Sequence, residues 1–342
     1  MSSVAAGLAG YYNRLRPDRE DLVISDVKDI TMGWETELYS FNVEFSEAGR
    51  LLKEERVVRL YPGNSPVEKA VREFEVMSRL FNAGYPVPQV FHLETGTATL
   101  AKPFIIMERI KGHNMLEDFL EGSEEQRRSL MTIFMKLFVH LHDLDGARLF
   151  PRAFDINDTT AYINRTLDSA RKNIRENRVD WLEPVPDWLD KHKNDVSCER
   201  LSIIHGDFHP NNIMLREDGS PVVIDWGAVA IGDYRVDLAW TILLSSTYTD
   251  PGLRKTMLQA YQEISRHKIR DFEFFEVMAI FRRLRDVSVS LTSGGEKMGM
   301  RPEAVEKMRQ DSEHLRRVYN LLSERTGLRV PEFEELLNAL QG

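Results

Sequence analysis

One short segment carries side chains whose types and spacing could do chemistry. It reads His205-Gly206-Asp207-Phe208-His209-Pro210-Asn211-Asn212. Thirteen residues after Asn212, the apolar run Pro221-Val222-Val223-Ile224 ends in Asp225. Carboxylate and amide oxygens are the ligands that Mg²⁺ takes in proteins, and a bound Mg²⁺ with a carboxylate that orients a hydroxyl is what phosphoryl transfer needs. The pattern therefore predicts a loop that handles magnesium and a nucleotide phosphate.

The offsets match those of a kinase catalytic loop. There an aspartate is followed five residues later by an asparagine, and an Asp-Phe-Gly segment comes further along the chain. Asp207 and Asn212 keep the five-residue offset, and Asp225-Trp226-Gly227 stands where Asp-Phe-Gly would. The match favours phosphoryl transfer over a loop whose polar residues only cap local backbone groups.

Strands and one helix are expected before this loop, because β-branched runs and turn residues alternate there. Periodicity at three- and four-residue steps predicts a helix over 67–82. The predicted strands cover residues 27–34, 36–45, 56–61, 89–93 and 104–108. Together they describe a small sheet with one crossing helix.

The chain after Glu108 is predicted to be mainly helical. Ser123 and Gln126 have the spacing of a capping box, and Asp218-Gly219 is a hairpin turn signal. Residues 153–199 are expected to form an insertion or two loosely patterned helices, and helices dominate from Asp237 onward. These patterns predict two lobes, residues 1–108 and 109–342, in an α+β fold.

With these motifs, the sequence resembles the aminoglycoside phosphotransferase family, the small-molecule kinases of the protein-kinase-like fold. Residues 205–212, 224–227 and 232–239 carry the resemblance most sharply. It implies a two-lobe fold with a small antiparallel sheet in the first lobe and a larger helical second lobe. It also implies Mg²⁺ and ATP as cofactors, with GTP not excluded. The expected acceptor is a small molecule with a hydroxyl, such as an aminoglycoside, an amino alcohol or a sugar-like compound.

The resemblance assigns roles to the loop residues. Asp207 is the expected catalytic residue that accepts or orients the proton of the acceptor hydroxyl. Asn212 and Asp225 are the expected metal ligands, and Asp237 is expected to brace the loop. His205 is expected to be a scaffold residue. For His209 two readings stay open: a donor to the transferred phosphate, counted as catalytic, or a residue that only packs in the loop.

Binding of the nucleotide is expected in the first lobe. Arg59 on the third predicted strand stands where protein kinases carry a lysine, and arginine keeps the charge that phosphate requires. Its helix partner is expected to be Glu73, with Glu75 as the alternative. Gly33 marks the only glycine of the expected phosphate-covering loop, and backbone groups between Glu108 and Ile110 are expected to bind the adenine.

Composition narrows the class of protein. The chain has 342 residues, a net charge of −9 and one cysteine, Cys198. The acidic balance argues against a nucleic-acid partner, and no apolar stretch approaches the roughly 18 residues of a membrane span. With no basic segment before the apolar N-terminus, we expect a soluble cytoplasmic protein and no membrane partner. The oligomeric state is left open.

Several alternatives remain. A kinase fold that binds nucleotide without turnover is the first, and a zinc hydrolase that uses His205, Asp207 and His209 is the second. A protein kinase is disfavoured, because no arginine follows His205 and no Ala-Pro-Glu run follows Asp225. The acceptor-specific candidates are residues that could equally be solvated or packed, namely Asp271, Glu273, Glu276, Trp181 and Trp188.

Overall fold

The computed structural model describes residues 3–19, 21–31, 36–151, 160–198, 200–293 and 313–340. The chain divides into two compact units. The first comprises Met1–Met115 and Asn211–Gly227, and the second comprises Leu116–Pro210 and Ala228–Gly342. No helix within the described ranges is both long and apolar enough to cross a membrane.

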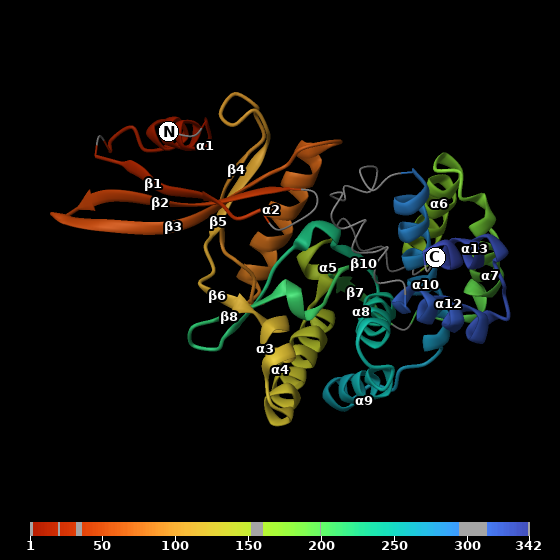
Figure 1. The fold of residues 1–342 in the computed structure, drawn as a ribbon. Helices are drawn as coiled ribbons and strands as arrows, with labels where there is room; N and C mark the ends of the chain where they lie inside the picture. The colour runs from red at the N-terminus through yellow and green to blue at the C-terminus, as the bar shows by residue number, and fades with distance from the viewer. Residues whose placement is uncertain are drawn as a thin grey trace. The chain divides into compact units, whose positions relative to one another are not determined.

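The first unit is built on a five-stranded antiparallel sheet in the order β1-β2-β3-β5-β4 (Figure 1). Its strands are β1 Val23–Asp29, β2 Glu37–Glu47, β3 Arg50–Leu60, β4 Val90–Glu94 and β5 Phe104–Glu108. The prediction of a strand over 27–34 was wrong at its start, since β1 begins at Val23, and β1 ends at Asp29, while residues 32–34 lie outside the described residues. β1 is a largely exposed edge strand whose register shifts between Ser25 and Lys28, so the alternation of apolar residues that marks a half-buried strand is absent.

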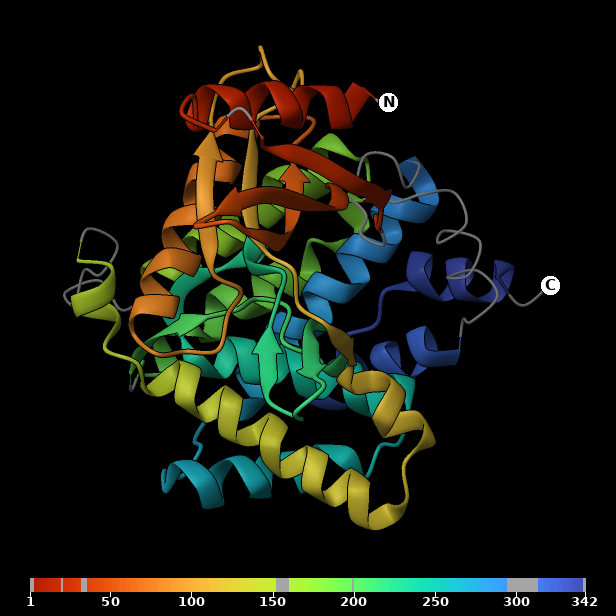
Figure 2. The same cartoon turned by 90° about the vertical axis from the view of Figure 1, so that its left-hand side faces the viewer.

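Two helices cover opposite faces of this sheet. α2 (Pro66–Asn82) confirms the predicted helix. α1 (Ser3–Leu15) was not predicted, and Figure 2 shows it, in red, lying against the sheet. Leu8, Tyr11 and Tyr12 of α1 join one buried cluster with Phe41, Val43, Val58, Phe104 and Ile106. Because neighbouring side chains on a strand point to opposite faces, Arg59 of β3 points away from α1 and towards α2.

A second, three-stranded sheet completes the first unit. β6 (Gly112–Asn114) pairs with β8 (Ile213–Arg216), which forms the predicted hairpin with β9 (Pro221–Val223). This pairing explains why 211–227 belongs to the first unit. The single boundary expected after residue 108 is thus corrected: the division falls after Met115, and the hairpin returns to the first unit because β8 bonds to β6.

The second unit is mainly helical. Its capping box at Ser123 and Gln126 is present as predicted, and the described residues of the 153–199 region form two α-helices and two short 3-10 helices. The principal elements are α4 Glu124–Asp143, α5 Gly146–Leu149, α6 Ala161–Glu176, α7 Pro184–His192, β7 Leu201–Ile204, β10 Ala230–Asp233, α8 Tyr234–Tyr248, α9 Leu253–Ser265, α10 Phe272–Ser293, α12 Glu313–Thr326 and α13 Pro331–Ala339. α3 (Met115–Glu121) begins at the division between the units. Buried side chains occur on nearly every turn of α8, so this helix lies in the core of the second unit.

Candidate active site

The predicted catalytic loop follows β7 in the second unit. β7 is antiparallel to β10, with Ile204 opposite Ala230. Gly206 adopts a left-handed φ of 82°, and a Cβ at this position would lie 2.7 Å from the Ala228 carbonyl oxygen. Only glycine avoids both the strain and the clash. The chain can therefore turn sharply between His205 and Asp207.

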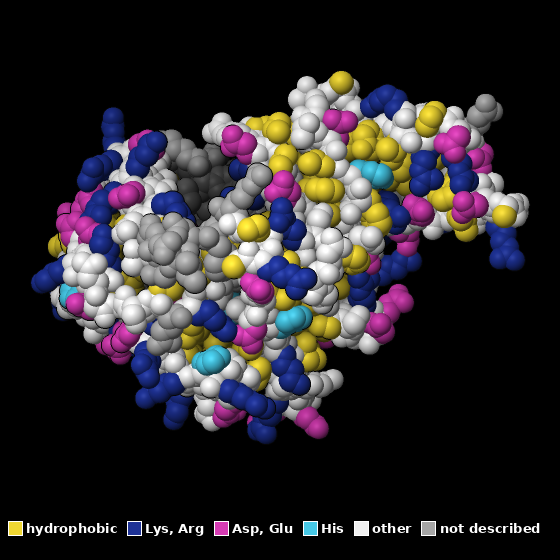
Figure 3. Space-filling model, turned by 180° about the vertical axis from the view of Figure 1, so that it is seen from behind, with side chains coloured by type: hydrophobic (Ala, Val, Ile, Leu, Met, Phe, Trp, Pro, Cys, Tyr) yellow, Lys and Arg dark blue, Asp and Glu magenta, His cyan; other side chains and the backbone are white. Residues whose placement is uncertain are grey.

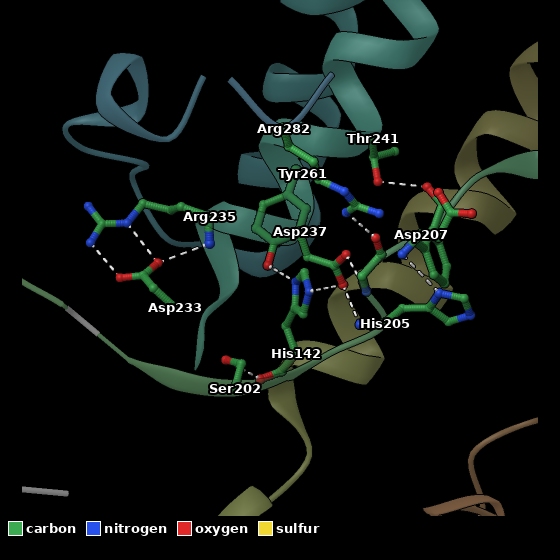
Figure 4. Close-up of polar contacts among 12 residues, drawn as sticks. His142, Ser202, His205, Asp207, Asp233, Arg235, Asp237, Thr241, Tyr261 and Arg282 are labelled. Atoms are coloured by element: carbon green, nitrogen blue, oxygen red, sulfur yellow. Dashed lines mark hydrogen bonds and ion pairs between the residues drawn. The ribbon is translucent and has the colours of Figure 1, made fainter. Parts of the chain in front are cut away.

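Asp237 lies in the first turn of α8 and accepts hydrogen bonds from the backbone of the catalytic loop at His205 and Gly206 (Figure 4). The backbone N–H groups of His205 and Gly206 donate to its carboxylate, with N···O distances of 2.6 and 2.9 Å. The side chain is 1% exposed. His142 Nε2 lies 3.5 Å from the same carboxylate, and His142 Nδ1 lies 2.8 Å from the Tyr261 hydroxyl. This is the geometry that a loop-bracing role requires.

Burial is the main cause that lowers the pKa of His142, against the raising effect of Asp237. A histidine whose folded pKa lies below its unfolded value of about 6.5 contributes stability that is present above that value and is lost as pH falls. We expect the free energy of unfolding to decrease between pH 7 and 5, with a contribution from His142 of at most about 1.4 kcal/mol per pH unit. His142→Gln should reduce this slope in urea titrations at several pH values, and an unchanged slope would contradict the assignment.

Asp207 is held from two sides. Trp240 of α8 donates its indole N–H to Asp207 Oδ1 at 2.8 Å, and His209 Nε2 lies 3.3 Å from Oδ2. Burial raises the pKa of Asp207, but the hydrogen bonds and charge of His209, the Trp240 donor and the Arg282 charge together lower it well below its usual range. The side chain keeps 36% exposure. Asp207 is thus an ionised, oriented and accessible carboxylate.

Further contacts fix the loop backbone. Arg282 of α10 donates to the Gly206 carbonyl at 2.6 Å and lies 3.8 Å from the centroid of the Trp240 ring (Figure 4). Phe208 is fully buried and stacks on Phe138 at a centroid distance of 4.2 Å, and its carbonyl accepts from Thr241 at 2.6 Å. The loop is therefore attached to several helices, so the direction of the Asp207 carboxylate is set by packing.

His205 is fully buried, and its Nδ1 accepts a hydrogen bond from the Asp207 backbone N–H at 3.3 Å. It therefore lies inside the loop, whereas Asp207 and His209 contact each other. Across the described ranges, the structure gathers no group of three or more histidine, cysteine, aspartate or glutamate residues suited to a metal. The zinc-site alternative is not supported by this arrangement.

In the first unit, Arg59 joins two carboxylates. Its Nη1 lies 3.1 Å from Glu73 Oε1 on α2, and its Nη2 lies 2.9 Å from Asp225 Oδ1. Glu73 is 2% exposed and accepts from the Tyr61 hydroxyl at 2.8 Å. Burial lowers the pKa of Arg59, but the charges of Glu73 and Asp225 outweigh it, so the guanidinium stays charged. Burial also raises the pKa of Glu73, more than Arg59 lowers it. Of the two glutamates considered, Glu73 is the partner of Arg59.

The two expected metal ligands stand at the base of the β8–β9 hairpin. The Ile224 N–H donates to the Asn212 carbonyl at 2.9 Å, so Asn212 lies beside the residue that precedes Asp225. Asp225 has a φ of 65° and a half-exposed side chain. Its Oδ1 accepts a hydrogen bond from Arg59, and its Oδ2 is the oxygen atom placed to ligate a metal ion. An amide oxygen and a carboxylate on adjoining segments suit a hard cation such as Mg²⁺.

Of the other residues expected to bind the nucleotide, the structure places Glu108 and Ile110 but not Gly33. Glu108 ends β5, where its side chain pairs with Arg216 at 2.7 Å and its N–H donates to Gln89. Ile110 follows this strand and is partly buried. Gly33 lies outside the described residues, so the structure does not place the expected phosphate-covering loop.

Of the three acidic residues considered as acceptor contacts, Glu276 is buried and the other two are exposed. Glu276 is 2% exposed and is bound by Arg254 at 2.5 Å and by Arg325 at 3.0 Å. Two guanidiniums neutralise it, so it does not offer charge to a ligand. Asp271 and Glu273 are exposed. The two tryptophans pack against other rings: the Trp181 ring lies 6.1 Å from the Phe333 ring of α13, and Trp188 stacks on His192 within α7 at 4.1 Å.

Sequence reasoning missed the residues that orient Asp207 and its loop. Trp240 comes three residues after Asp237, close to one turn of α8, so helical spacing could have placed both side chains on one face. Arg282 and His142 are far from the loop in sequence. Their side chains reach it only through the packing of α10 and α4, for which no local pattern exists.

Comparison with known proteins identifies the class. A model of the phosphotransferase enzyme family matches residues 30–272. The chain therefore belongs to this family, and the expected relationship to the aminoglycoside phosphotransferases is confirmed. A curated relative, acyl-CoA dehydrogenase family member 10 of Mus musculus, is 29% identical over 203 residues, which cover 57% of this chain and 19% of the relative. The chain thus spans about a fifth of the length of that relative.

Solved structures show the same fold. A protein from Ralstonia eutropha JMP134, assigned to the aminoglycoside phosphotransferases, superposes with a TM-score of 0.68 at 18% identity, covering 94% of this chain and 97% of that chain. The aminoglycoside phosphotransferase APH(2'')-Ib, in an ADP-bound structure, has a TM-score of 0.56 at 18% identity, with 93% and 99% covered. The predicted α+β, protein-kinase-like fold is confirmed.

Proposed function

We propose that this protein is a small-molecule kinase, which transfers the γ-phosphate of ATP to a hydroxyl group of its acceptor. The observation that carries this proposal is the Asp207 carboxylate, which Trp240 and His209 hold ionised and accessible on a braced loop. A carboxylate held in this way suits one task in phosphoryl transfer, the orientation of the attacking hydroxyl.

In the proposed reaction, Asp207 accepts the hydrogen bond, and then the proton, of the acceptor hydroxyl. That oxygen forms a bond to the γ-phosphorus as the bond to the β,γ-bridging oxygen breaks, which yields the phosphorylated acceptor and ADP. His209 contacts Asp207 and helps to orient its carboxylate in this proposal. His205 and Asp237 hold the loop and touch no reacting atom in this proposal.

The residues proposed to serve the nucleotide lie in the first unit. Arg59 would bind the phosphates, with Glu73 fixing its guanidinium, and backbone groups near Glu108 and Ile110 would bind the base. Asn212 and Asp225 would hold Mg²⁺, which neutralises phosphate charge when bound. Gly33 is proposed to belong to the covering loop. ATP is the proposed donor, in keeping with the ADP in the solved relative, and GTP is the alternative.

Asp225→Ala should weaken binding of the magnesium–nucleotide complex. The substitution removes a metal ligand and one of the two carboxylates paired with Arg59. We expect a loss of affinity of about 10- to 100-fold, since a hydrogen bond to a charged group contributes about 1.5–3 kcal/mol. Calorimetric titration with Mg-ATP and with ATP plus EDTA measures this. Asp218→Ala, which removes a carboxylate at the exposed hairpin turn, is the matched control. Equal affinity of Asp225→Ala and wild type would contradict the ligand role.

An acceptor panel tests the proposed function. Aminoglycosides, amino alcohols, sugars and hydroxylated acyl-CoA thioesters are incubated with protein, ATP and Mg²⁺, and ADP is measured. The thioesters are included because the curated relative is named for acyl-CoA chemistry. A kinase produces ADP only with a suitable acceptor. Binding of ATP with no ADP from any acceptor would favour the inactive, nucleotide-binding alternative.

A further inference from the structure

The second unit contains a pocket that is lined by two arginines, several hydroxyl groups and apolar side chains. Its volume is about 340 Å³, within the range of small-molecule sites. The lining residues are Tyr162, Arg165, Thr166, Ser169, Ala230, Ile231 and Arg285. Two of them are arginines, three carry hydroxyl groups and none is acidic. By contrast, basic and acidic side chains are interspersed over the face of the molecule in Figure 3.

The charge of this lining is only partly compensated. Arg285 Nη2 lies 2.6 Å from Asp286, which is also 3.9 Å from Arg282 Nε, so one carboxylate serves two guanidiniums. Arg165 of α6 is exposed and forms no ion pair with any described residue. Among the residues that the structure describes, the pocket lining therefore carries more positive than negative charge, and guanidinium groups with neighbouring hydroxyls are the donors that bind carboxylate and phosphate oxygens.

Glycine helps to build the wall. A Cβ at Gly232 of β10 would lie 2.9 Å from Cγ of Tyr162, so the absence of a side chain lets the Tyr162 ring approach the strand. Burial raises the pKa of Tyr162, and the ring stays neutral. Tyr162 therefore supplies a hydroxyl and an apolar surface without negative charge beside the two arginines.

The pocket lies near the proposed catalytic carboxylate. Ala230 of the lining pairs with Ile204, which stands three residues before Asp207. Paired strand residues are about 5 Å apart, and three residues span at most about 11 Å, so these Cα positions lie within about 16 Å of each other. One small molecule could place a hydroxyl at Asp207 and another group in the pocket.

We propose that this pocket binds an anionic group, a carboxylate or a phosphate, of the acceptor molecule. That the bound anion belongs to an acceptor rests on the proposed kinase function. Of the acceptor candidates named from the sequence, Glu276 is neutralised by two arginines, whereas Arg165 and Arg285 line a pocket beside the strand pair that leads to Asp207. A charged anchor would hold the acceptor in register, which raises its effective concentration at Asp207.

Direct binding tests the pocket without turnover. Wild-type protein is titrated calorimetrically with inorganic phosphate and with acetate, at constant ionic strength and without Mg²⁺, in the presence and absence of ADP. We expect binding of at least one anion that persists with ADP, and about 10-fold weaker binding for Arg165→Ala and for Arg285→Ala. Lys172→Ala removes a charge from the same helix at a position paired with Glu176, and should bind as wild type does. Which anion binds more tightly distinguishes phosphate from carboxylate.

Kinetics then tests the link to the acceptor. With an anionic acceptor found in the panel, Arg165→Ala should raise KM about 10-fold or more and leave kcat nearly unchanged, and the neutral amide of the same acceptor should show no such effect. Arg285→Lys, which keeps a charge beside Asp286, checks that a loss in Arg285→Ala is not misfolding.

Anion binding that ADP abolishes, or that both alanine variants retain, would overturn the proposal. If the pocket binds anions but no acceptor yields ADP, the proposed function fails while the anion site stands. If an anionic acceptor is phosphorylated, and Arg165→Ala and Arg285→Ala have the wild-type KM and anion affinity, the anion site alone is refuted.

Discussion

Asp207→Asn should lower acceptor phosphorylation by about 10²- to 10⁴-fold, the usual contribution of a catalytic base. Asparagine has nearly the same shape and keeps an oxygen that can accept from Trp240, so the loop should stay in place. It cannot take a proton. The residues proposed to bind the nucleotide belong to the first unit, so affinity for Mg-ATP should change less than threefold.

The measurement is kcat/KM for the acceptor together with a calorimetric Kd for Mg-ATP, on wild type and variant. Asp168→Asn, on the exposed face of α6, serves as the matched control for an aspartate-to-asparagine change in the same unit. An Asp207→Asn enzyme with more than half of the wild-type kcat/KM would remove Asp207 from the catalytic role.

Asp237→Ala should destabilise the second unit by about 3–5 kcal/mol. Two backbone N–H groups, of the buried His205 and the partly buried Gly206, would lose their acceptor, and an unsatisfied buried donor costs about 1–3 kcal/mol. His142 would lose a partner as well. Asp237→Asn keeps one oxygen acceptor and should lose about half as much. Both variants should also reduce turnover, because the backbone that carries Asp207 is released.

Urea unfolding gives the free energies, and hydrogen exchange of a peptide over residues 201–209 shows whether the loss is local. Protection of the His205 and Gly206 amides should drop in both variants. A loss below 1 kcal/mol for Asp237→Ala, with unchanged exchange in this peptide, would contradict the bracing role.

The elements nearest the site could be predicted because their signals are local. The five-residue offset from Asp207 to Asn212 is a property of one loop, and the apolar run of β5 is short and uninterrupted. The likeness to protein kinases placed Arg59 opposite a glutamate of the helix over 67–82, with Glu73 preferred to Glu75, and the structure joins Arg59 to Glu73 at 3.1 Å.

The parts that escaped prediction depend on packing between distant segments. α1 contains two glycines, which have weak helix preference, and it is stabilised by the contact of Leu8, Tyr11 and Tyr12 with the sheet. The pocket combines residues of α6, β10 and α10. Nothing in the local sequence around Arg165 or Arg285 shows that they line one pocket, and neither residue was named as an acceptor contact from the sequence.

The most direct measurement of the central claim is the stoichiometry of the reaction. Wild-type protein is incubated with ATP, Mg²⁺ and an acceptor from the panel, and ADP and the phosphorylated acceptor are quantified together by mass spectrometry. Our account predicts one phosphorylated acceptor for each ADP, with neither product formed above background by Asp207→Asn. ADP formed without a phosphorylated acceptor, or product formed equally by the variant, would contradict phosphoryl transfer through Asp207.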